Sequence, residues 1–174
     1  HIILLVNNKV KSTDQSNAVI LASYRLQGTV VNLVQPQRRL LLEDDSVHIQ
    51  HDKKLRITCK KYTMMIFNDL ILFAKFDKKV RNISSNGRRR KKKNGDDAPK
   101  FLRHKHSWLM KNISVKGEQS AYDPRHGWPF YIMKRINIVN NDNDDNEYGT
   151  TVERFKLFAS TKEKRAAIVE TIKE

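Results

Sequence analysis

The segment YTMMIFNDLILFAK, residues 62–75, constrains the fold more than any other part of this 174-residue chain. It contains two dense apolar runs that only Asn68 and Asp69 separate. Each run has the length of a β-strand, and its aromatic and other large apolar residues favour a strand. Asparagine and aspartate tolerate the positive φ angles of a type I′ turn. The segment therefore predicts a β-hairpin closed by a two-residue turn.

Alternating apolar residues predict further strands on both sides of this hairpin. Before it, Val47 and Ile49 alternate within SVHIQH. The strand LRITCKKYTMMIF is predicted to place Ile57, Tyr62, Met64 and Ile66 on one face and Met65 and Phe67 on the other. Later strands are predicted at residues 101–110, 129–139 and 150–159. We therefore expect about six or seven antiparallel strands in sequence.

The N-terminal residues 1–27 are predicted to be helical. Val19, Ala22 and Leu26 recur at the spacing of one helix face. Residues 12–14, Ser-Thr-Asp, fit either the surface of one continuous helix or the cap of a second helix. The continuous helix is the favoured interpretation.

The chain ends on a second predicted helix. Ser160 and Glu163 have the S-x-x-E spacing of a capping box at its start. A narrow apolar stripe follows, formed by Ala167, Ile168, Thr171 and Ile172. Antiparallel strands closed by one C-terminal amphipathic helix describe a mainly β fold, a small barrel or sandwich with a helical plug.

The composition favours a phosphate-bearing partner. Lys and Arg number 34 and Asp and Glu 19, so the net charge is +15. This charge attracts nucleic acid, anionic lipid or acidic protein, and composition alone does not choose among them. No apolar run approaches the ~20 residues that span a bilayer. The single cysteine, Cys59, excludes an internal disulfide and fits a reducing compartment.

No motif for catalysis, metal binding or cofactor binding is recognisable in the sequence. His104 and His106 are expected on one face of a strand, but no third ligand at metal spacing accompanies them. Cys59 has no positioned histidine partner for nucleophilic chemistry. Glycine-rich phosphate loops, triad spacings and paired carboxylates are also missing. We therefore predict no metal, no cofactor and no catalytic residue.

Four motifs together resemble one family. MIFNDLILFAK resembles the β2–β3 hairpin of the pleckstrin-homology (PH) domains that follow a Dbl-homology (DH) domain in Rho guanine-nucleotide exchange factors. LLVNNKVKSTDQSN resembles the last DH helix, NLVQPQRRLL the DH–PH junction, and STKEKRAAIVETI the terminal PH helix. The resemblance spans nearly the whole chain, and the order of the motifs makes it specific.

The resemblance implies a domain organisation. Residues 1–28 would be the C-terminal helix of a DH domain, 29–42 the linker, and 43–174 a seven-stranded PH domain with loop insertions near 82–100 and 140–149. The chain departs from the family in two places. Ile168 stands where the terminal PH helix usually carries tryptophan, and no clean Lys-x-Arg precedes the second strand's apolar run.

The resemblance also implies a lipid-binding surface at the open end of the barrel. PH domains hold inositol phosphates there because several ammonium or guanidinium groups converge on the phosphate. The basic residues expected at this end are Lys53, Lys54, Arg56, Lys60, Lys61, Lys75, Lys78, Lys79 and Arg81. A basic face that attracts anionic membrane without a specific pocket is the alternative.

A polybasic loop is the sharpest charge feature of the chain. It contains Arg88, Arg89, Arg90, Lys91, Lys92 and Lys93. Electrostatic attachment to a membrane and an insertion without a role are the main interpretations of this loop, and a nuclear or nucleic-acid role is a further one. No aromatic residue is interleaved in the run, which weakens a role in stacking on single-stranded nucleic acid.

The function implied is that of a regulatory module rather than an enzyme. The expected partners are a Rho-family small GTPase, through the parent DH domain, and anionic lipids at the cytoplasmic surface of the membrane, with protein partners besides. Asn7 would contact the GTPase, with Asn8 as the alternative contact, or else be a polar residue on the helix surface. The rest of the DH bundle is needed for nucleotide exchange, so this chain alone is expected to be inert. A basic nucleic-acid-binding barrel or a protein-interaction module is the alternative function.

Overall fold

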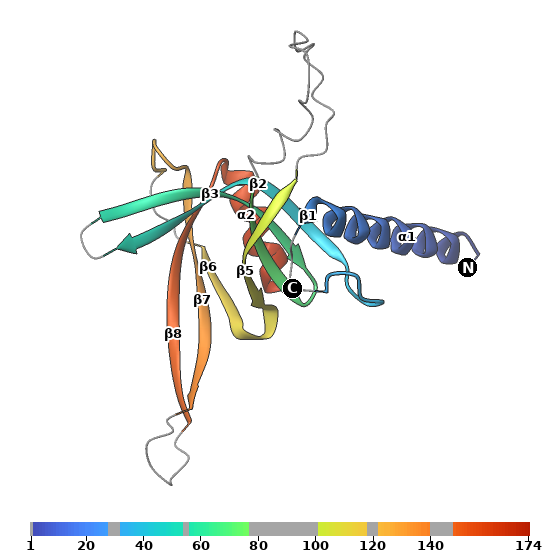
Figure 1. The fold of residues 1–174 in the computed structure, drawn as a ribbon. Helices are drawn as coiled ribbons and strands as arrows, with labels where there is room; N and C mark the ends of the chain where they lie inside the picture. The colour runs from blue at the N-terminus through green and yellow to red at the C-terminus, as the bar shows by residue number, and fades with distance from the viewer. Residues whose placement is uncertain (1, 28–31, 54–55, 77–100, 118–121, 140–147) are drawn as a thin grey trace, which may run out of the picture.

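The computed structural model describes residues 2–27, 32–53, 56–76, 101–117, 122–139 and 148–174 (Figure 1). For residues 2–13, 27, 52–53, 56, 137–139 and 148–149 it describes the backbone alone. The elements are α1 (Ile2–Arg25), β1 (Leu26–Gln27), β2 (Leu40–Lys53), β3 (Arg56–Phe67), β4 (Leu70–Phe76), β5 (Leu102–Leu109), η2 (Met110–Asn112), β6 (Ile113–Gly117), β7 (Trp128–Val139), β8 (Tyr148–Ala159) and α2 (Lys162–Lys173).

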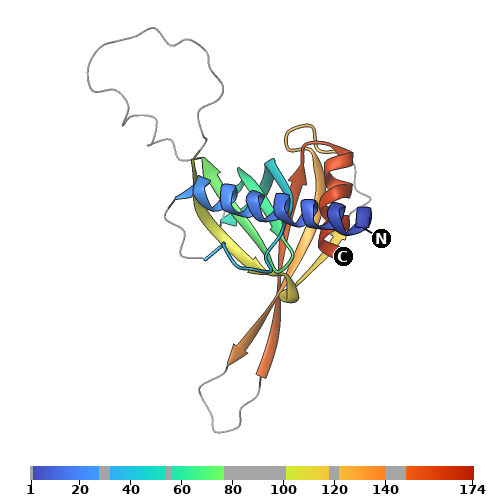
Figure 2. The same cartoon turned by 90° about the vertical axis from the view of Figure 1, so that its right-hand side faces the viewer.

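The strands form one sheet in the order β1-β5-β4-β3-β2-β8-β7-β6. All neighbours from β5 to β6 are antiparallel, which confirms the expected seven-stranded antiparallel fold. The short β1 adds in parallel to β5, where Leu26 pairs with Leu102. Figure 2 shows that the sheet is strongly bent, and the long β7–β8 hairpin extends beyond the rest of it.

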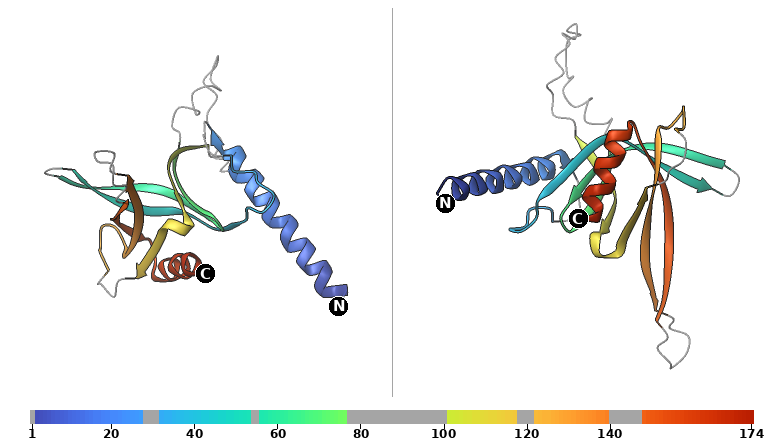
Figure 3. Two further views of the ribbon diagram at one scale, coloured as in Figure 1. Left: turned by 90° about the horizontal axis from the view of Figure 1, so that it is seen from below. Right: turned by 180° about the vertical axis from the view of Figure 1, so that it is seen from behind.

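Two hydrophobic cores lie on opposite faces of β3 and β4. The inner core fills the bend of the sheet beneath α2 and includes Tyr62, Met64 and Ile66 of β3. The outer core lies beneath α1 and the linker and includes Met65 and Phe67. Figure 3 shows α1 and α2 on different sides of the bent sheet. The apolar density of residues 62–74 follows from this arrangement, because strands covered on both faces need apolar residues at every position.

The predicted faces of β3 are confirmed except at Ile57, which is 68% exposed. The prediction was wrong because Ile57 lies five positions before Tyr62. Side chains alternate between the two faces along a strand, so residues five positions apart lie on opposite faces. Two further elements were missed. The five-residue β6 lies outside every predicted strand, and Leu26, predicted to be helical, belongs to β1.

The N-terminal helix is continuous, as favoured from the sequence, and its predicted face is buried. Val19, Ala22 and Leu26 all belong to the outer core. Of the predicted loop insertions, residues 82–100 lie outside the described residues, as do residues 140–147. β8 begins at Tyr148, inside the second predicted insertion. No helix among the described residues is long and apolar enough to cross a membrane.

The predicted cap of α2 was one residue too early. Thr161 is the N-cap, and its Oγ1 accepts a hydrogen bond from the backbone N–H of Lys164 at 3.2 Å. The hydroxyl of Ser160 instead lies 3.0 Å from that of Ser46 on β2. In the helix itself, Ile168 is fully buried in the inner core, whereas Ala167 is exposed. The aliphatic plug predicted at Ile168 is therefore confirmed.

Candidate functional site

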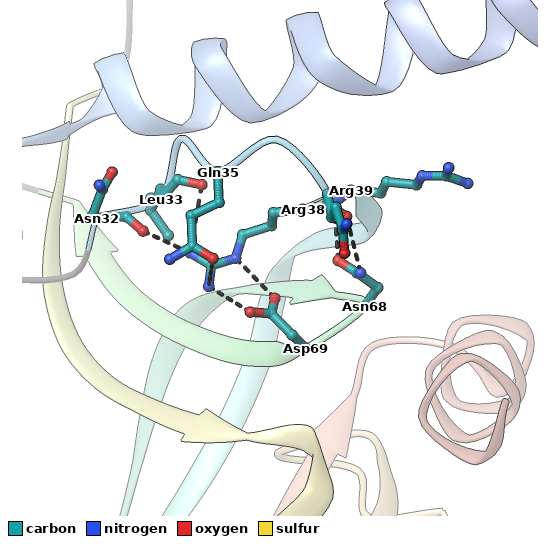
Figure 4. A network of polar contacts seen from close by, with 8 residues as sticks. Asn32, Leu33, Gln35, Arg38, Arg39, Asn68 and Asp69 are labelled. Atoms are coloured by element: carbon teal, nitrogen blue, oxygen red, sulfur yellow. Dashed lines mark hydrogen bonds and ion pairs between the residues drawn. The ribbon is translucent and has the colours of Figure 1, made fainter.

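Arg38 is a buried cation in the linker between β1 and β2 (Figure 4). Its side chain is only 6% exposed. Nε donates to Oδ1 of Asp69 at 2.8 Å, and a second guanidinium nitrogen donates to Oδ2 of the same carboxylate. The remaining donors bind the carbonyl oxygen of Asn32 at 2.7 Å and Oε1 of Gln35 at 3.2 Å. This two-point pairing fixes the position and the orientation of the linker relative to the turn that contains Asp69.

Asn68 holds the linker through its side-chain amide. Its Oδ1 accepts from the backbone N–H of Arg39 at 2.9 Å, and its Nδ2 donates to the carbonyl of Gln37 at 3.1 Å. The predicted two-residue turn is therefore confirmed between β3 and β4, and its side chains do more than permit a turn. We call Arg38, Asn68 and Asp69 the linker lock. The turn was recognisable in the sequence, but its partners were not, because they lie 29 to 31 residues away.

The linker lock and the outer core together fix α1 against the sheet. The buried face of α1 belongs to one core with residues of β3, β4 and β5, and Leu33 of the linker is buried in the same core. At the end of α1, Arg25 pairs with Glu43 on β2 at 2.7 Å. The geometry therefore joins the N-terminal helix to the β domain by apolar packing, an ion pair and a hydrogen-bonded linker.

A second group of polar residues gathers at the open end of the inner face. It surrounds Tyr62, whose hydroxyl lies 3.0 Å from Nε2 of His51. Nζ of Lys75 lies 4.5 Å from the centre of the Tyr62 ring, and the His106 ring lies 6.2 Å from it. Lys60 points to the same face, because it shares the alternation of Tyr62 and pairs with the inner-core residue Ile49. We call His51, Lys60, Tyr62, Lys75 and His106 the rim cluster.

The rim cluster carries positive charge that nearby groups do not neutralise. Burial lowers the pKa of Lys75, and the charges of Lys60 and Lys105 lower it further. Burial also lowers the pKa of His106, with added repulsion from His104 and several lysines. Among the described residues, no carboxylate lies within 4.0 Å of the ammonium group of Lys60 or Lys75. An anion placed here would relieve this repulsion.

The predicted lipid-binding residues divide into three groups. Lys60 and Lys75 meet at the rim cluster, whereas Lys61 lies on the opposite face of the sheet, where it pairs with His48. Lys53 and Arg56 pair at the end of the β2–β3 hairpin, with the backbone alone described. Lys54, Lys78, Lys79 and Arg81 lie outside the described residues, as does the polybasic loop, residues 88–93. Asn7 lies within α1, but its side chain is not described.

His51, Tyr62 and His106 were not predicted as members of this group. Tyr62 was predicted only to share one face of a strand with Met64 and Ile66, and its side chain is buried. Only pairing of the strands brings the three side chains together, since they come from β2, β3 and β5. No local motif carried this information.

The prediction that His104 and His106 share a face was wrong. His104 pairs with Ala74 and His106 with Phe73, and the register shifts between these two pairs. Paired residues lie on the same face, and Ala74 and Phe73 belong to the outer and inner cores. The extra residue of a β-bulge therefore places the two imidazoles on opposite faces. No group of three metal-binding side chains occurs among the described residues.

The buried imidazole of His104 is expected to make the folded chain less stable in mild acid. Its Nε2 is buried without a hydrogen-bond partner among the described residues, and burial lowers the pKa of its imidazole. The unfolded chain therefore takes up this proton at higher pH than the folded chain, and stability falls as pH drops below about 6.5. Melting temperatures of the wild type and His104→Gln should be compared at pH 7.5 and 5.5. The melting temperature of the wild type should fall by more than that of His104→Gln between pH 7.5 and pH 5.5. An equal fall in both proteins would contradict the prediction.

No protein family model and no curated protein matches the sequence. Solved structures do match. The DH/PH domains of p115-RhoGEF superpose with a TM-score of 0.53 at 12% identity, covering 99% of this chain and 43% of that chain. The PDZ-RhoGEF DH/PH domains, crystallised with GTP-γ-S activated RhoA, superpose with a TM-score of 0.54 at 13% identity, covering 97% and 41%.

The chain thus spans less than half the length of these structures, and at this identity the likeness concerns the fold. A match over 97–99% of the chain extends across both the β domain and the N-terminal helix. The chain has the fold of a PH-type domain preceded by a helix, as found in the DH/PH units of Rho exchange factors.

Proposed function

We propose that this chain is the PH module, with the last DH helix, of a Rho-family guanine-nucleotide exchange factor. The observation that carries the proposal is the fixed attachment of α1 to the β domain. A helix held by the outer core and the linker lock transmits the position of one domain to the other. A regulatory module that orients its neighbour needs such a rigid joint.

The proposed partner of the complete protein is a Rho-family GTPase. One structure that shares this fold contains PDZ-RhoGEF together with RhoA, which supports a partner of that class. Asn7 on α1 is the proposed contact with the GTPase. We infer that the chain is catalytically inert by itself, because one helix does not form the surface of a helical bundle. Addition of this chain to a Rho GTPase should leave the rate of GDP release unchanged.

The proposed attachment site for the membrane is the rim cluster. Lys60 and Lys75 present two cations that no carboxylate pairs with in the described part of the chain, and the net charge is +15. Each basic residue near an anionic bilayer contributes about 1 kcal/mol to binding. Weak binding to anionic lipid or phosphoinositide at the cytoplasmic surface of the membrane follows from this charge. The predicted basic residues outside the described part of the chain would add to it.

The test replaces both rim lysines at once. Lys60→Gln/Lys75→Gln removes two charges, so we expect about a 30-fold weaker partition onto vesicles that contain phosphatidylserine and phosphatidylinositol bisphosphate. Lys162→Gln/Lys173→Gln is the matched control, since it removes two charges from exposed positions on α2. Co-sedimentation measures the partition, and circular dichroism verifies folding.

Two results would contradict the membrane proposal. The first is an equal loss of binding in the rim variant and in the α2 control, which would reduce the rim to general surface charge. The second is negligible vesicle binding by the wild type together with tight, steeply salt-dependent binding to an RNA or DNA oligonucleotide, which would favour the nucleic-acid-binding alternative.

A further inference from the structure

The outer face of β6, β7 and β8 carries a cationic surface around one serine. Ser114 on β6, Met133 on β7 and Arg154 on β8 form one row across this face, because Met133 pairs with both of the others. Their neighbours Val115 and Ile132 belong to the inner core, so the row itself points outward. Residues two positions further along a strand share its face. The basic residues that this rule places here, besides Arg154, are Lys116, Arg135 and Lys156.

Acidic residues of the same strands do not balance this positive charge. Within β6, β7 and β8, Glu153 is the one acidic residue, and it pairs with Lys134 on the inner face. Among the described residues, no ion pair joins Arg154 or a lysine of this surface to a carboxylate. The guanidinium of Arg154 instead stacks on the ring of Tyr131, 3.7 Å from its centre. An anion placed beside Ser114 would therefore meet only positive charge.

Ser114 is exposed and stands in a charge pattern that selects a class of protein kinase. The segment KNISVK, residues 111–116, places Lys111 three positions before the serine and Lys116 two positions after it. All three side chains are exposed. Kinases choose among serines partly by the charges that flank them, and lysines at these positions fit a substrate groove that is lined with carboxylates. The pattern therefore indicates a kinase that prefers basic substrates.

The edge position of β6 gives an enzyme access to this serine. β6 is the last strand of the sheet, and among the described residues it pairs with β7 alone (Figure 1). The backbone groups on the other edge of such a strand are available to an extended partner. A substrate serine enters a kinase groove in an extended chain, and β6 provides that conformation at Ile113–Gly117.

We infer that Ser114 is a phosphorylation site for a protein kinase that selects basic substrates. In the reaction, Oγ of Ser114 attacks the γ-phosphorus of ATP, and a new O–P bond forms. The bond from this phosphorus to the bridging oxygen breaks, and ADP leaves. The serine proton passes to the catalytic aspartate of the kinase. The modification needs neither the rim cluster nor a GTPase, so it stands apart from the function proposed above.

The surrounding cations hold the phosphate once it is attached. The group adds a charge of about −1.5 to −2 and three acceptor oxygens. Adjacent strands lie about 4.8 Å apart, so Arg154 on β8 is roughly 10 Å from Ser114 on β6. Rotation of Arg154 away from Tyr131 brings its guanidinium above Met133, where it meets the phosphate, and Lys116 joins from the same strand. This ion pair ties the edge strand to β8 across β7.

The first experiment treats the folded chain with ATP and the catalytic domain of protein kinase C, and maps the product by tandem mass spectrometry. We expect phosphate on Ser114 and its loss at this position in Ser114→Ala. Lys111→Gln/Lys116→Gln should lower kcat/KM for Ser114 by at least about tenfold, because it removes two charge-assisted contacts with the kinase. The α2 control, Lys162→Gln/Lys173→Gln, removes the same charge elsewhere and should leave kcat/KM unchanged.

The second experiment tests whether Arg154 holds the phosphate. After phosphorylation, the backbone amides of β6 should exchange with deuterium about tenfold more slowly, since the new ion pair must break before the strand opens. Arg154→Gln should be phosphorylated at the rate of the wild type but should lack this protection. Circular dichroism verifies that each variant is folded.

A phosphorylation site at Ser114 is contradicted by phosphate that maps only to other residues of the folded chain. It is also contradicted if a synthetic peptide of residues 108–117 is phosphorylated and the folded chain is not, because the sheet then withholds the serine. Unchanged exchange of the β6 amides would show that Arg154 does not hold the phosphate. Absence of phosphate on Ser114, together with weaker vesicle binding by Arg135→Gln/Arg154→Gln, would assign these cations to the membrane instead.

Discussion

Replacing Asp69 with alanine is expected to lower the free energy of unfolding by about 2–3 kcal/mol. The substitution leaves the guanidinium of Arg38, which is 6% exposed, without its carboxylate. The loss is smaller than for a fully buried pair, because the side chain of Asp69 is 40% exposed and water screens part of the interaction. Urea denaturation of the wild type and the variant measures the difference.

The control for this prediction is Asp45→Ala, which removes an exposed carboxylate from β2. It should change stability by less than about 0.5 kcal/mol. The double variant Arg38→Met/Asp69→Ala should be more stable than Asp69→Ala alone, because no uncompensated buried charge remains. Faster hydrogen exchange at the backbone amide of Arg38, which donates to the carbonyl of Gln35, should accompany the loss in Asp69→Ala. Equal stability of Asp69→Ala and Asp45→Ala would show that the linker lock does not stabilise the fold.

Replacing Phe73 with alanine is expected to cost about 3–5 kcal/mol of stability. Phe73 is fully buried in the inner core, where its ring centre lies 4.7 Å from that of Trp108 and 6.3 Å from that of Tyr62. Truncation removes this packing and leaves a cavity beneath α2 that the surrounding strands cannot fill. Thermal and urea unfolding, monitored by tryptophan fluorescence, measure the effect.

Phe76→Ala is the matched control on the same strand. Phe76 is 41% exposed at the end of β4, so its truncation removes the same atoms from a site that water already reaches. We expect a loss below about 1 kcal/mol for this variant. A comparable loss in both variants would mean that burial at the centre of the sheet does not decide the stability of the fold.

The elements predicted best are those whose signals are local. The hairpin at Asn68–Asp69 and the buried face of α1 follow from spacing within a few residues, and both are confirmed. β6 escaped prediction because ISVKG buries only Val115 and shows no sustained alternation. The register of β5 was not predicted, because a bulge shifts the pairing of β5 with β4 between Phe73 and Ala74, and nothing in the sequence marks that shift.

The candidate sites were predictable only in their charge. The basic character of β3 and β4 was evident, but Lys60 and Lys61 lie on opposite faces, so the predicted cluster divides between two surfaces. The cations around Ser114 come from three strands, and only strand pairing brings them together. The linker lock likewise depends on contacts between residues about 30 positions apart.

The double-sided burial of β3 and β4 has a consequence for where this protein can be divided. The outer face of β4 and β5 presents Leu70, Leu72, Ala74 and Leu102 to α1 and the linker. A polypeptide that starts at Leu40 would leave this apolar surface exposed to water, and exposed apolar surface promotes self-association. The unit that folds cooperatively therefore begins before Val19, inside the helix, and the border predicted from the sequence at residues 28–29 runs beside a core that both sides share.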